Sequence, residues 1–204
     1  MIAIADYGMG NRRSVEKALE HVGATSTITA DHNAIRAAAA IILPGVGAFP
    51  EAMRNLRRAG LGDVLKERAQ AGVPLLGICL GMQLLFESTT EHEGAEGLGI
   101  LPGTVTRLQS PRLPHIGWNL VTIERPASLT EGLGDAAAFY HVHSFACRPS
   151  DPADVVGTSE YGERFVSIVE RDNVMASQFH PEKSSRDGLR MLRNFAQLAA
   201  VAVA

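Results

Sequence analysis

One cysteine of this chain stands between two glycines, directly after an apolar run. The segment GICLGMQ, residues 77–83, follows VPLL, residues 73–76, so Cys79 lies where an apolar strand would end. A cysteine that only packs in a core needs no glycine on either side, whereas a sharp turn from strand to helix does. We therefore expect a nucleophile elbow in which Cys79 stands out from the sheet and the backbone N–H of Leu80 can bind an oxyanion.

A base for this cysteine and a carboxylate to orient the base occur together in FHPEKS, residues 179–184. A residue before proline is extended, and side chains two residues apart in an extended segment point the same way. Glu182 can then hold one imidazole nitrogen of His180 and leave the other for the sulfur of Cys79. In isolation, HPE would be an ordinary surface turn, so this interpretation depends on Cys79.

A glycine loop follows the apolar segment ILPG and completes the expected site. Gly45 and Gly47 flank Val46, and such a loop can present backbone N–H groups to an anion. Gln83 lies four residues after Cys79, on the same face of the expected helix. It could contact a bound substrate, although a buried glutamine with another partner fits the same position. Together these residues predict a cysteine hydrolase.

The elements that must position these residues alternate between strand and helix in the first half of the chain. Strands are expected at 2–6, 25–29, 40–43 and 73–78, and helices at 13–22, 49–59, 61–71 and 80–88. The second half has short runs rich in β-branched and aromatic residues, at 104–108, 119–124, 137–145, 164–170 and 173–179, and a closing helix at 185–200. This order predicts a single α/β domain, residues 1–204, doubly wound and flavodoxin-like, with a mixed, largely parallel sheet.

Composition excludes several classes of protein. Of the 204 residues, 46% are hydrophobic and 20% charged, and the formal net charge of −3 argues against a nucleic-acid-binding protein. Two cysteines are too few for a secreted disulfide framework. The N-terminal MIAIAD lacks a basic signal region, and the apolar run at 198–204 is far too short for a membrane span. We expect a soluble protein of the cytoplasm.

These motifs together resemble the class I (triad) glutamine amidotransferase family. Within it, the chain resembles the glutaminase subunits of imidazole glycerol phosphate synthases, which serve histidine biosynthesis. The segments that carry the resemblance are DYGMGN (6–11), PGVGAF (44–49), CLGMQLLFE (79–87), PHIGWN (114–119), VHS (142–144) and FHPEKS (179–184). They extend over nearly the whole chain.

The resemblance implies a glutaminase mechanism and a set of site residues. Cys79 attacks the side-chain amide of glutamine, His180 protonates the leaving ammonia and activates the water that clears the thioester, and Glu182 orients His180. The oxyanion hole comprises the backbone of Gly45, Val46 and Gly47 with the N–H of Leu80. The glutamine amino-acid moiety is bound by Gln83 and Glu91, with Gly47 and the backbone of His143 and Ser144 alongside. The nearby Glu87 and Glu93 are alternatives to Glu91.

The resemblance also implies a partner. In this family ammonia passes through a (β/α)8-barrel cyclase subunit, in a heterodimer, to the intermediate PRFAR, and the products are imidazole glycerol phosphate and AICAR. The glutaminase is nearly silent until the partner binds its own ligand. The residues expected at the interface are Asn11, Trp118, Tyr140 and Lys183. No cofactor, nucleic acid or membrane is implied.

Two residues depart from the family pattern. Arg12 stands where an apolar residue is expected, and His141 stands where an aromatic residue is expected. His141 and His143 form an H-x-H pair on one face of a strand, a spacing that can bind zinc, but no cysteine or carboxylate motif is near it. We therefore expect no metal site. Cys147 has no elbow and no paired base, so we interpret it as structural.

Three other functions fit parts of the sequence. A different class I glutaminase, such as the one that serves pyridoxal phosphate synthesis, would share the triad, but PHIGWN and FHPEKS argue against it. A non-catalytic binding module would keep the fold, but Cys79, His180 and Glu182 are all present. A cysteine peptidase would act on peptides and not on glutamine.

Overall fold

A nine-stranded mixed sheet crosses the part of the molecule that the computed structural model describes, residues 1–201. Residues 202–204 of the expected domain lie outside the described residues. The strands lie in the order β2 (Ser26–Thr29), β1 (Ile2–Ala5), β3 (Ala40–Gly45), β4 (Leu75–Cys79), β13 (Val174–Ser177), β12 (Glu163–Arg171), β11 (Val155–Tyr161), β8 (His115–Ile123) and β9 (Ala136–His143). The pairs from β2 to β13 are parallel and those from β13 to β9 are antiparallel, so the mixed sheet is confirmed.

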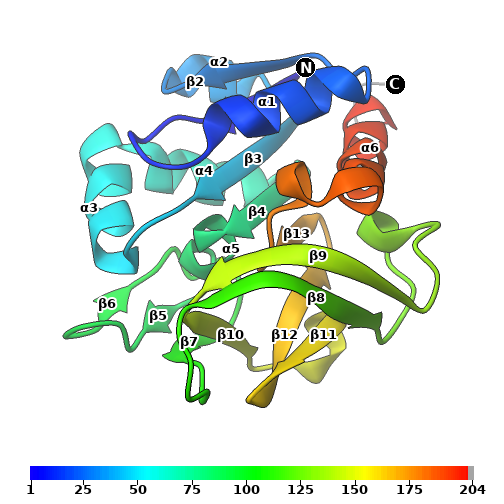
Figure 1. Cartoon of the computed structure of the whole chain (residues 1–204). Helices are drawn as coiled ribbons and strands as arrows, with labels where there is room; N and C mark the ends of the chain where they lie inside the picture. The colour runs from blue at the N-terminus through cyan, green and yellow to red at the C-terminus, as the bar shows by residue number, and fades with distance from the viewer. Residues whose placement is uncertain (202–204) are drawn as a thin grey trace.

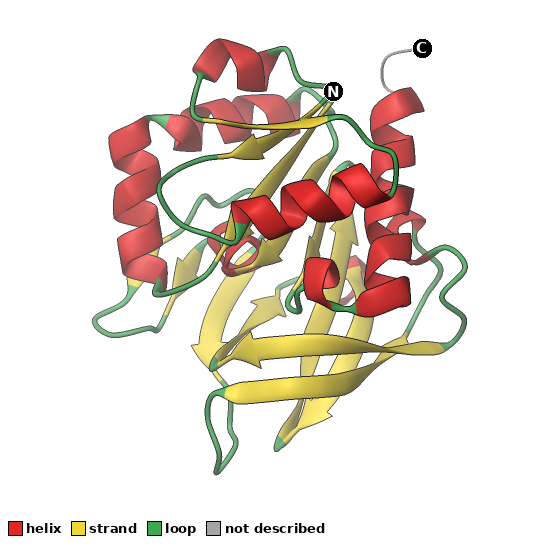
Figure 2. Cartoon of the chain, turned by 45° about the horizontal axis from the view of Figure 1, so that its top comes forward, coloured by secondary structure: helices red, strands yellow, loops and turns green. Residues whose placement is uncertain are grey.

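Helices cover both faces of the parallel half, as Figures 1 and 2 show. The helices are α1 (Arg12–His21), α2 (His32–Arg36), α3 (Phe49–Ala59), α4 (Leu61–Gln70) and α6 (Ser185–Val201). Along β1, Ile2 and Ile4 pack in the core beneath α1 and α6, whereas Ala3 and Ala5 pack beneath α2, α3 and α4. This alternation buries each strand on two faces, and it confirms the doubly wound arrangement.

A second, four-stranded sheet lies beside the site and was not expected. Its order is β10 (Phe145–Pro149), β7 (Gly103–Arg107), β5 (Ser88–Thr89) and β6 (Ala95–Glu96). The single strand expected at 137–145 is wrong, because the chain leaves the large sheet after β9 and enters the small one as β10. Short 3₁₀ turns, η1 (Ser128–Thr130), η2 (Pro152–Asp154) and η3 (Pro181–Lys183), join the remaining elements.

The helix expected at 80–88 is also wrong in length. It forms as α5 (Leu80–Leu84) and ends there. The carbonyls that would continue it accept bonds from another segment: Leu84 O from Leu98 N, at 2.8 Å, and Leu85 O from Ile100 N, at 2.8 Å. Hydrogen bonds to residues 98 and 100 replace the bonds that would continue the helix, and helix propensity alone does not predict them.

No helix among residues 1–201 combines the length and the apolar character needed to cross a bilayer.

Candidate active site

Cys79 lies at the turn between β4 and α5. Its backbone has φ 55° and ψ −109°, a region that residues other than glycine rarely adopt. A residue held there costs about 1–3 kcal/mol, and such strain is concentrated at functional sites. The sharp turn expected from the sequence is present, and it carries the side chain of Cys79 beyond the carboxyl end of β4.

The two flanking glycines allow this turn to pack tightly. A Cβ atom on Gly81 would overlap the carbonyl oxygen of Leu43 in the neighbouring strand β3. A Cβ atom on Gly77 would lie 2.9 Å from the carbonyl oxygen of Gly81. The glycines are therefore required by the close approach of the backbone, as the sequence pattern suggested.

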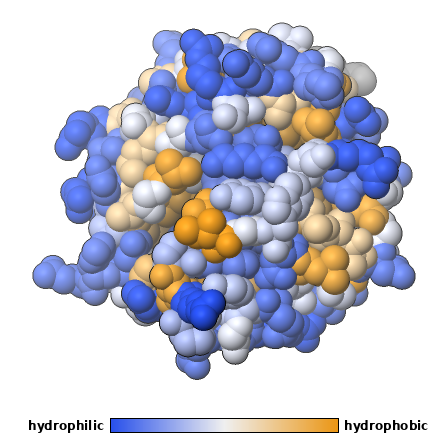
Figure 3. All heavy atoms as spheres, in the orientation of Figure 1, coloured by the Kyte–Doolittle hydropathy of each residue, from blue (hydrophilic) through white to orange (hydrophobic). Residues whose placement is uncertain are grey.

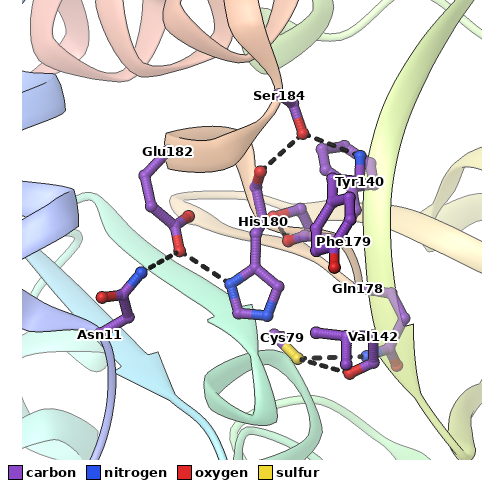
Figure 4. Close-up of polar contacts among 10 residues, drawn as sticks. Asn11, Cys79, Tyr140, Val142, Gln178, Phe179, His180, Glu182 and Ser184 are labelled. Carbon is purple, nitrogen blue, oxygen red and sulfur yellow. Dashed lines mark hydrogen bonds and ion pairs between the residues drawn. The ribbon is translucent and has the colours of Figure 1, made fainter. Parts of the chain in front are cut away.

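His180 and Glu182 lie beside Cys79, as Figure 4 shows. His180 Nδ1 is 2.8 Å from Glu182 Oε1, and both side chains are buried. Our reason for expecting this was partly wrong. His180 is extended, with φ −101° and ψ 96°, but residues 181–183 form the 3₁₀ turn η3 and not an extended segment. The turn itself brings the carboxylate back to the ring.

The second nitrogen of the imidazole is oriented toward the sulfur. Figure 4 shows the Nε2 side of the His180 ring facing Cys79. This Nε2 atom is buried and has no hydrogen-bond partner within residues 1–201. Burial lowers the pKa of His180, but the neighbouring Cys79 and then Glu182 outweigh burial and raise the pKa to about 10. Together the three residues therefore favour an imidazolium next to the sulfur.

The glycine loop lies beside the elbow. Gly45 is the register partner of Cys79 across β3 and β4, so Val46 and Gly47 follow at the level of the sulfur. The start of the loop is held by Tyr7, whose buried hydroxyl donates to Pro44 O at 2.8 Å. Burial, with Cys79 as a second cause, raises the pKa of Tyr7, which keeps it a hydrogen-bond donor.

A cavity of about 510 Å³ opens at the sulfur. Its walls bring together residues of the elbow, the glycine loop and the strand end at 142–145: Val46, Gly47, Cys79, Leu80, Gln83, Glu91, Val142, His143, Ser144 and Phe145. Gln83, Glu91, His143 and Ser144, which were expected to contact the glutamine amino-acid moiety, line this cavity, whereas Gly45 does not. The volume is that of a small-molecule site.

Two of these residues are already held by protein groups. Gln83 Nε2 donates to Phe145 O and to Gln178 Oε1, each at 3.1 Å. Glu91 Oε2 accepts from Phe49 N at 2.8 Å, which fixes the carboxylate at the cavity wall. Neither Glu87 nor Glu93 lines the cavity, and Glu87 Oε2 instead accepts from Gly103 N.

Both ring nitrogens of His143 face protein atoms. Its Nδ1 is 2.8 Å from Phe145 O, and its Nε2 faces the buried rings of His115 and His141. Burial and the neighbouring histidines lower the pKa of His141 to about 2, and burial lowers that of His143 to about 3. Both rings are therefore neutral at pH 7, and what His143 offers the cavity is its backbone.

Sequence reasoning missed five residues that line the cavity: His92, Arg107, Pro114, Val142 and Phe145. Arg107 ends β7 in the small sheet, and its position beside Cys79 depends on how that sheet packs. No local pattern around TVTRL indicates this. The cavity therefore has both an acidic residue, Glu91, and a basic one, Arg107, in its walls.

The four residues expected at a partner interface occupy two settings. Trp118 is 56% exposed, its ring meets that of Tyr140 edge to face at 6.4 Å, and Lys183 Nζ lies 6.0 Å from the Tyr140 ring centroid. Asn11 instead reaches inward, and its Nδ2 donates to Glu182 Oε1 at 3.2 Å. It thus links the loop before α1 directly to the carboxylate beside His180.

The outer face of β8 carries further apolar side chains. Ile116 is 60% exposed and Leu120 is 56% exposed, at alternate positions on either side of Trp118. Figure 3, which shows the side of the molecule with β8 and β9, has hydrophobic side chains in several groups on this surface. Three large apolar residues in one exposed row are typical of an interaction surface.

The geometry fits one kind of chemistry. A thiol on a strained turn lies next to an imidazole whose other nitrogen is held by a buried carboxylate. Such a set attacks a carbonyl carbon and then returns the proton to the leaving group. The Leu80 N–H and the loop at Val46 lie at the same cavity, where a developing oxyanion would need donors.

The chain is similar in sequence to a family of glutamine amidotransferases and to subunits of one enzyme in particular. Residues 3–198 match the family model for glutamine amidotransferase class-I. The imidazole glycerol phosphate synthase subunit HisH of Moorella thermoacetica is 50% identical over 97% of this chain and 94% of its own length. The subunit of the same name from Aquifex aeolicus is 47% identical over 96% of each chain.

Solved structures agree on the fold. A crystal structure of a glutamine amidotransferase superposes with a TM-score of 0.78 at 22% identity, covering 98% of this chain and 100% of that one. The structure of PurLQS from Thermotoga maritima superposes with a TM-score of 0.72 at 20% identity, covering 100% and 98%. The chain belongs to the class-I glutamine amidotransferase family, in the group that contains the HisH subunits of imidazole glycerol phosphate synthase.

Proposed function

We propose that this chain is the glutaminase subunit of an imidazole glycerol phosphate synthase in histidine biosynthesis. The observation that carries the proposal is that Cys79 lines the cavity and has His180 and Glu182 beside it, in a chain half identical to HisH subunits. Glutamine is the substrate, and glutamate and ammonia are the products. The free thiols of Cys79 and Cys147 suit a reducing compartment, so we place the reaction in the cytoplasm.

The reaction proceeds through a thioester. The Cys79 sulfur attacks the side-chain amide carbon, and the oxyanion receives hydrogen bonds from Leu80 N–H and from the backbone at Gly45, Val46 and Gly47. His180 gives its proton to the leaving ammonia and then activates a water molecule, which displaces the sulfur. Glu182 orients the imidazole ring and stabilises its positive charge throughout. These groups need no cofactor.

The substrate is a zwitterion, and the cavity has both charges to receive it. We assign the α-ammonium group to Glu91 and Gln83, and part of the α-carboxylate to the backbone at His143 and Ser144. Arg107 lines the same cavity and is exposed, so its guanidinium can add a charge-assisted contact to the carboxylate.

Replacing Arg107 by methionine should raise the KM for glutamine about tenfold, which is about 1.4 kcal/mol, with a smaller change in kcat. The contact is made far from the reacting carbon, so it stabilises the ground state and the transition state alike. Steady-state glutamate release measures both constants. Arg112→Met, which removes an exposed arginine outside the cavity wall, is the matched control. An unchanged KM would exclude the assignment.

We further propose that the ammonia passes to a (β/α)8-barrel cyclase subunit, in a heterodimer that converts PRFAR into imidazole glycerol phosphate and AICAR. The surface formed by Trp118, Tyr140 and Lys183 is the docking face, with Ile116 and Leu120 beside Trp118. Asn11 links the loop before α1 to Glu182. A loop with glycines at 45 and 47 can rearrange when the partner docks.

The proposal is tested by measuring glutamate release from glutamine by the chain alone, and with the cyclase subunit of the same organism plus PRFAR. A large rise that requires both partner and ligand is the expected result. High activity of the isolated chain would keep the glutaminase but contradict its control. Cleavage of peptides and not of glutamine would indicate a peptidase, and failure to react with a glutamine-like electrophile would indicate a non-catalytic module.

Trp118→Ala should weaken binding of the cyclase subunit about 30-fold, which is about 2 kcal/mol, because exposed tryptophans dominate interface energies. Calorimetric titration of one subunit into the other measures the dissociation constant. Gln70→Ala, an exposed change on α4, should leave the constant unaltered. Equal binding by both variants would place the docking face elsewhere.

A further inference from the structure

Three histidines of the large sheet meet in the interior beside the active site. In the antiparallel pair β8–β9, His115 lies directly opposite His143, and His141 lies two residues before His143 on the same face. The exposed fractions of His115, His141 and His143 are 3%, 0% and 6%. The sequence showed only the H-x-H pair, because the register that adds His115 is a tertiary feature.

The ring nitrogens converge on one point. His143 Nε2 is 3.4 Å from His115 Nδ1 and 3.2 Å from His141 Nδ1. One ring nitrogen from each of the three histidines lies within 4.8 Å of the other two. Nitrogens about 2.0–2.1 Å from a tetrahedral zinc ion lie about 3.3–3.4 Å apart. The separations of 3.4 and 3.2 Å therefore match those between ligands of one ion.

Hydrogen bonding among the rings does not account for this arrangement. His143 Nδ1 donates to Phe145 O, so in the neutral ring Nε2 has a single lone pair, which faces two other nitrogens. His141 Nε2 is buried and has no partner within residues 1–201. Asn119 Nδ2 bonds Glu160 O at 3.0 Å, and its contact with His115 Nε2, at 3.4 Å, is too long to fix the His115 tautomer.

We propose that His115 Nδ1, His141 Nδ1 and His143 Nε2 form a binding site for one divalent transition-metal ion, with zinc as the preferred metal. Three neutral imidazoles are a common zinc ligand set, and a fourth position remains open for water. The bond from His143 Nδ1 to Phe145 O is the outer contact that orients a metal-bound histidine.

Aromatic rings enclose the three ligands. Tyr161 stacks on His115 with ring centroids 4.0 Å apart, and Phe165 meets all three imidazoles edge to face. The Phe179 ring lies against His141. This apolar shell limits solvent around the ion, and the cavity lined by Pro114 and His143 gives a route to the site from the active-site side.

The proposed site adjoins the active site. Val142 and His143 line the cavity that holds Cys79, so an ion bound by His143 would lie next to that cavity.

The test must separate this site from Cys79, which can itself bind zinc. Zinc binding is measured by calorimetry on Cys79→Ala protein, and cobalt is added to the same protein to record its visible absorption. We expect one zinc per chain and the strong bands of tetrahedral cobalt. His141→Phe in the Cys79→Ala background should lose both signals, whereas His21→Gln, an exposed change on α1, should keep them.

Thermal unfolding shows that each variant is folded and gives a second readout. Zinc should raise the Tm of Cys79→Ala and of its His21→Gln derivative, but not that of the His141→Phe derivative. No zinc binding by the Cys79→Ala protein, or equal binding after His141→Phe, would overturn the proposal. Neither outcome bears on glutaminase function, because the protein in these measurements lacks the sulfur.

Discussion

Cys79→Ala protein should release no glutamate from glutamine above background, a fall of roughly 10⁴-fold or more. Without the sulfur no thioester forms, because His180 and Glu182 then have no nucleophile to activate. The expected loss appears in kcat, and it is measured with the cyclase subunit and PRFAR present, because the isolated wild-type chain is expected to have little activity to lose. Glutamate production is measured by coupled oxidation, and mass spectrometry of the wild-type chain with a glutamine-like electrophile places the label on Cys79.

Cys147→Ala is the matched control for this loss. Cys147 is also a free, fully buried thiol, but it lies on β10 and does not line the cavity. It should retain full activity and remain unlabelled. Alanine at position 79 must keep the strained backbone with φ 55°. Unfolding of the two variants therefore also tests whether the loss of activity comes from the missing sulfur and not from misfolding. Residual activity of Cys79→Ala within tenfold of wild type would contradict the thioester mechanism.

Much of the parallel half could be predicted from the sequence. Its strands are short apolar runs, its helices repeat apolar residues every three or four positions, and glycines end them, so local signals and tertiary structure agree. The elbow could also be predicted. The backbones approach so closely there that glycine is required at positions 77 and 81, and these two glycines form a recognisable sequence pattern around Cys79. The motif at 179–184 could be assigned to a base and its carboxylate from the residue types and their order, although the 3₁₀ turn that brings them together was not expected.

The rest depended on pairing that no short segment encodes. The end of α5 is set by bonds to residues 97–101, and the position of Arg107 is set by the small sheet. His115 meets His143 only because β8 and β9 pair in one register. A one-residue slip of that register would turn His115 outward.

Replacing Glu182 by glutamine should lower kcat about 10²-fold or more and change the pH profile. Glu182 has two effects on His180: it accepts the Nδ1–H at 2.8 Å, and its charge helps to raise the pKa of the ring. Glutamine has nearly the same shape, so the cavity is preserved. Asn11 can still donate to the amide oxygen as it does to Glu182 Oε1.

The direction of the pH change follows from the charge. His180 must be protonated to donate a proton to the leaving ammonia. Activity therefore declines on the alkaline side as the pH passes the pKa of His180. Glu182 raises that pKa, and its removal lowers it. The alkaline limb of kcat/KM against pH should therefore move to lower pH in Glu182→Gln, while Glu20→Gln, an exposed change on α1, leaves it in place. A large loss of kcat with an unmoved alkaline limb would mean that Glu182 only positions the ring and does not tune its charge.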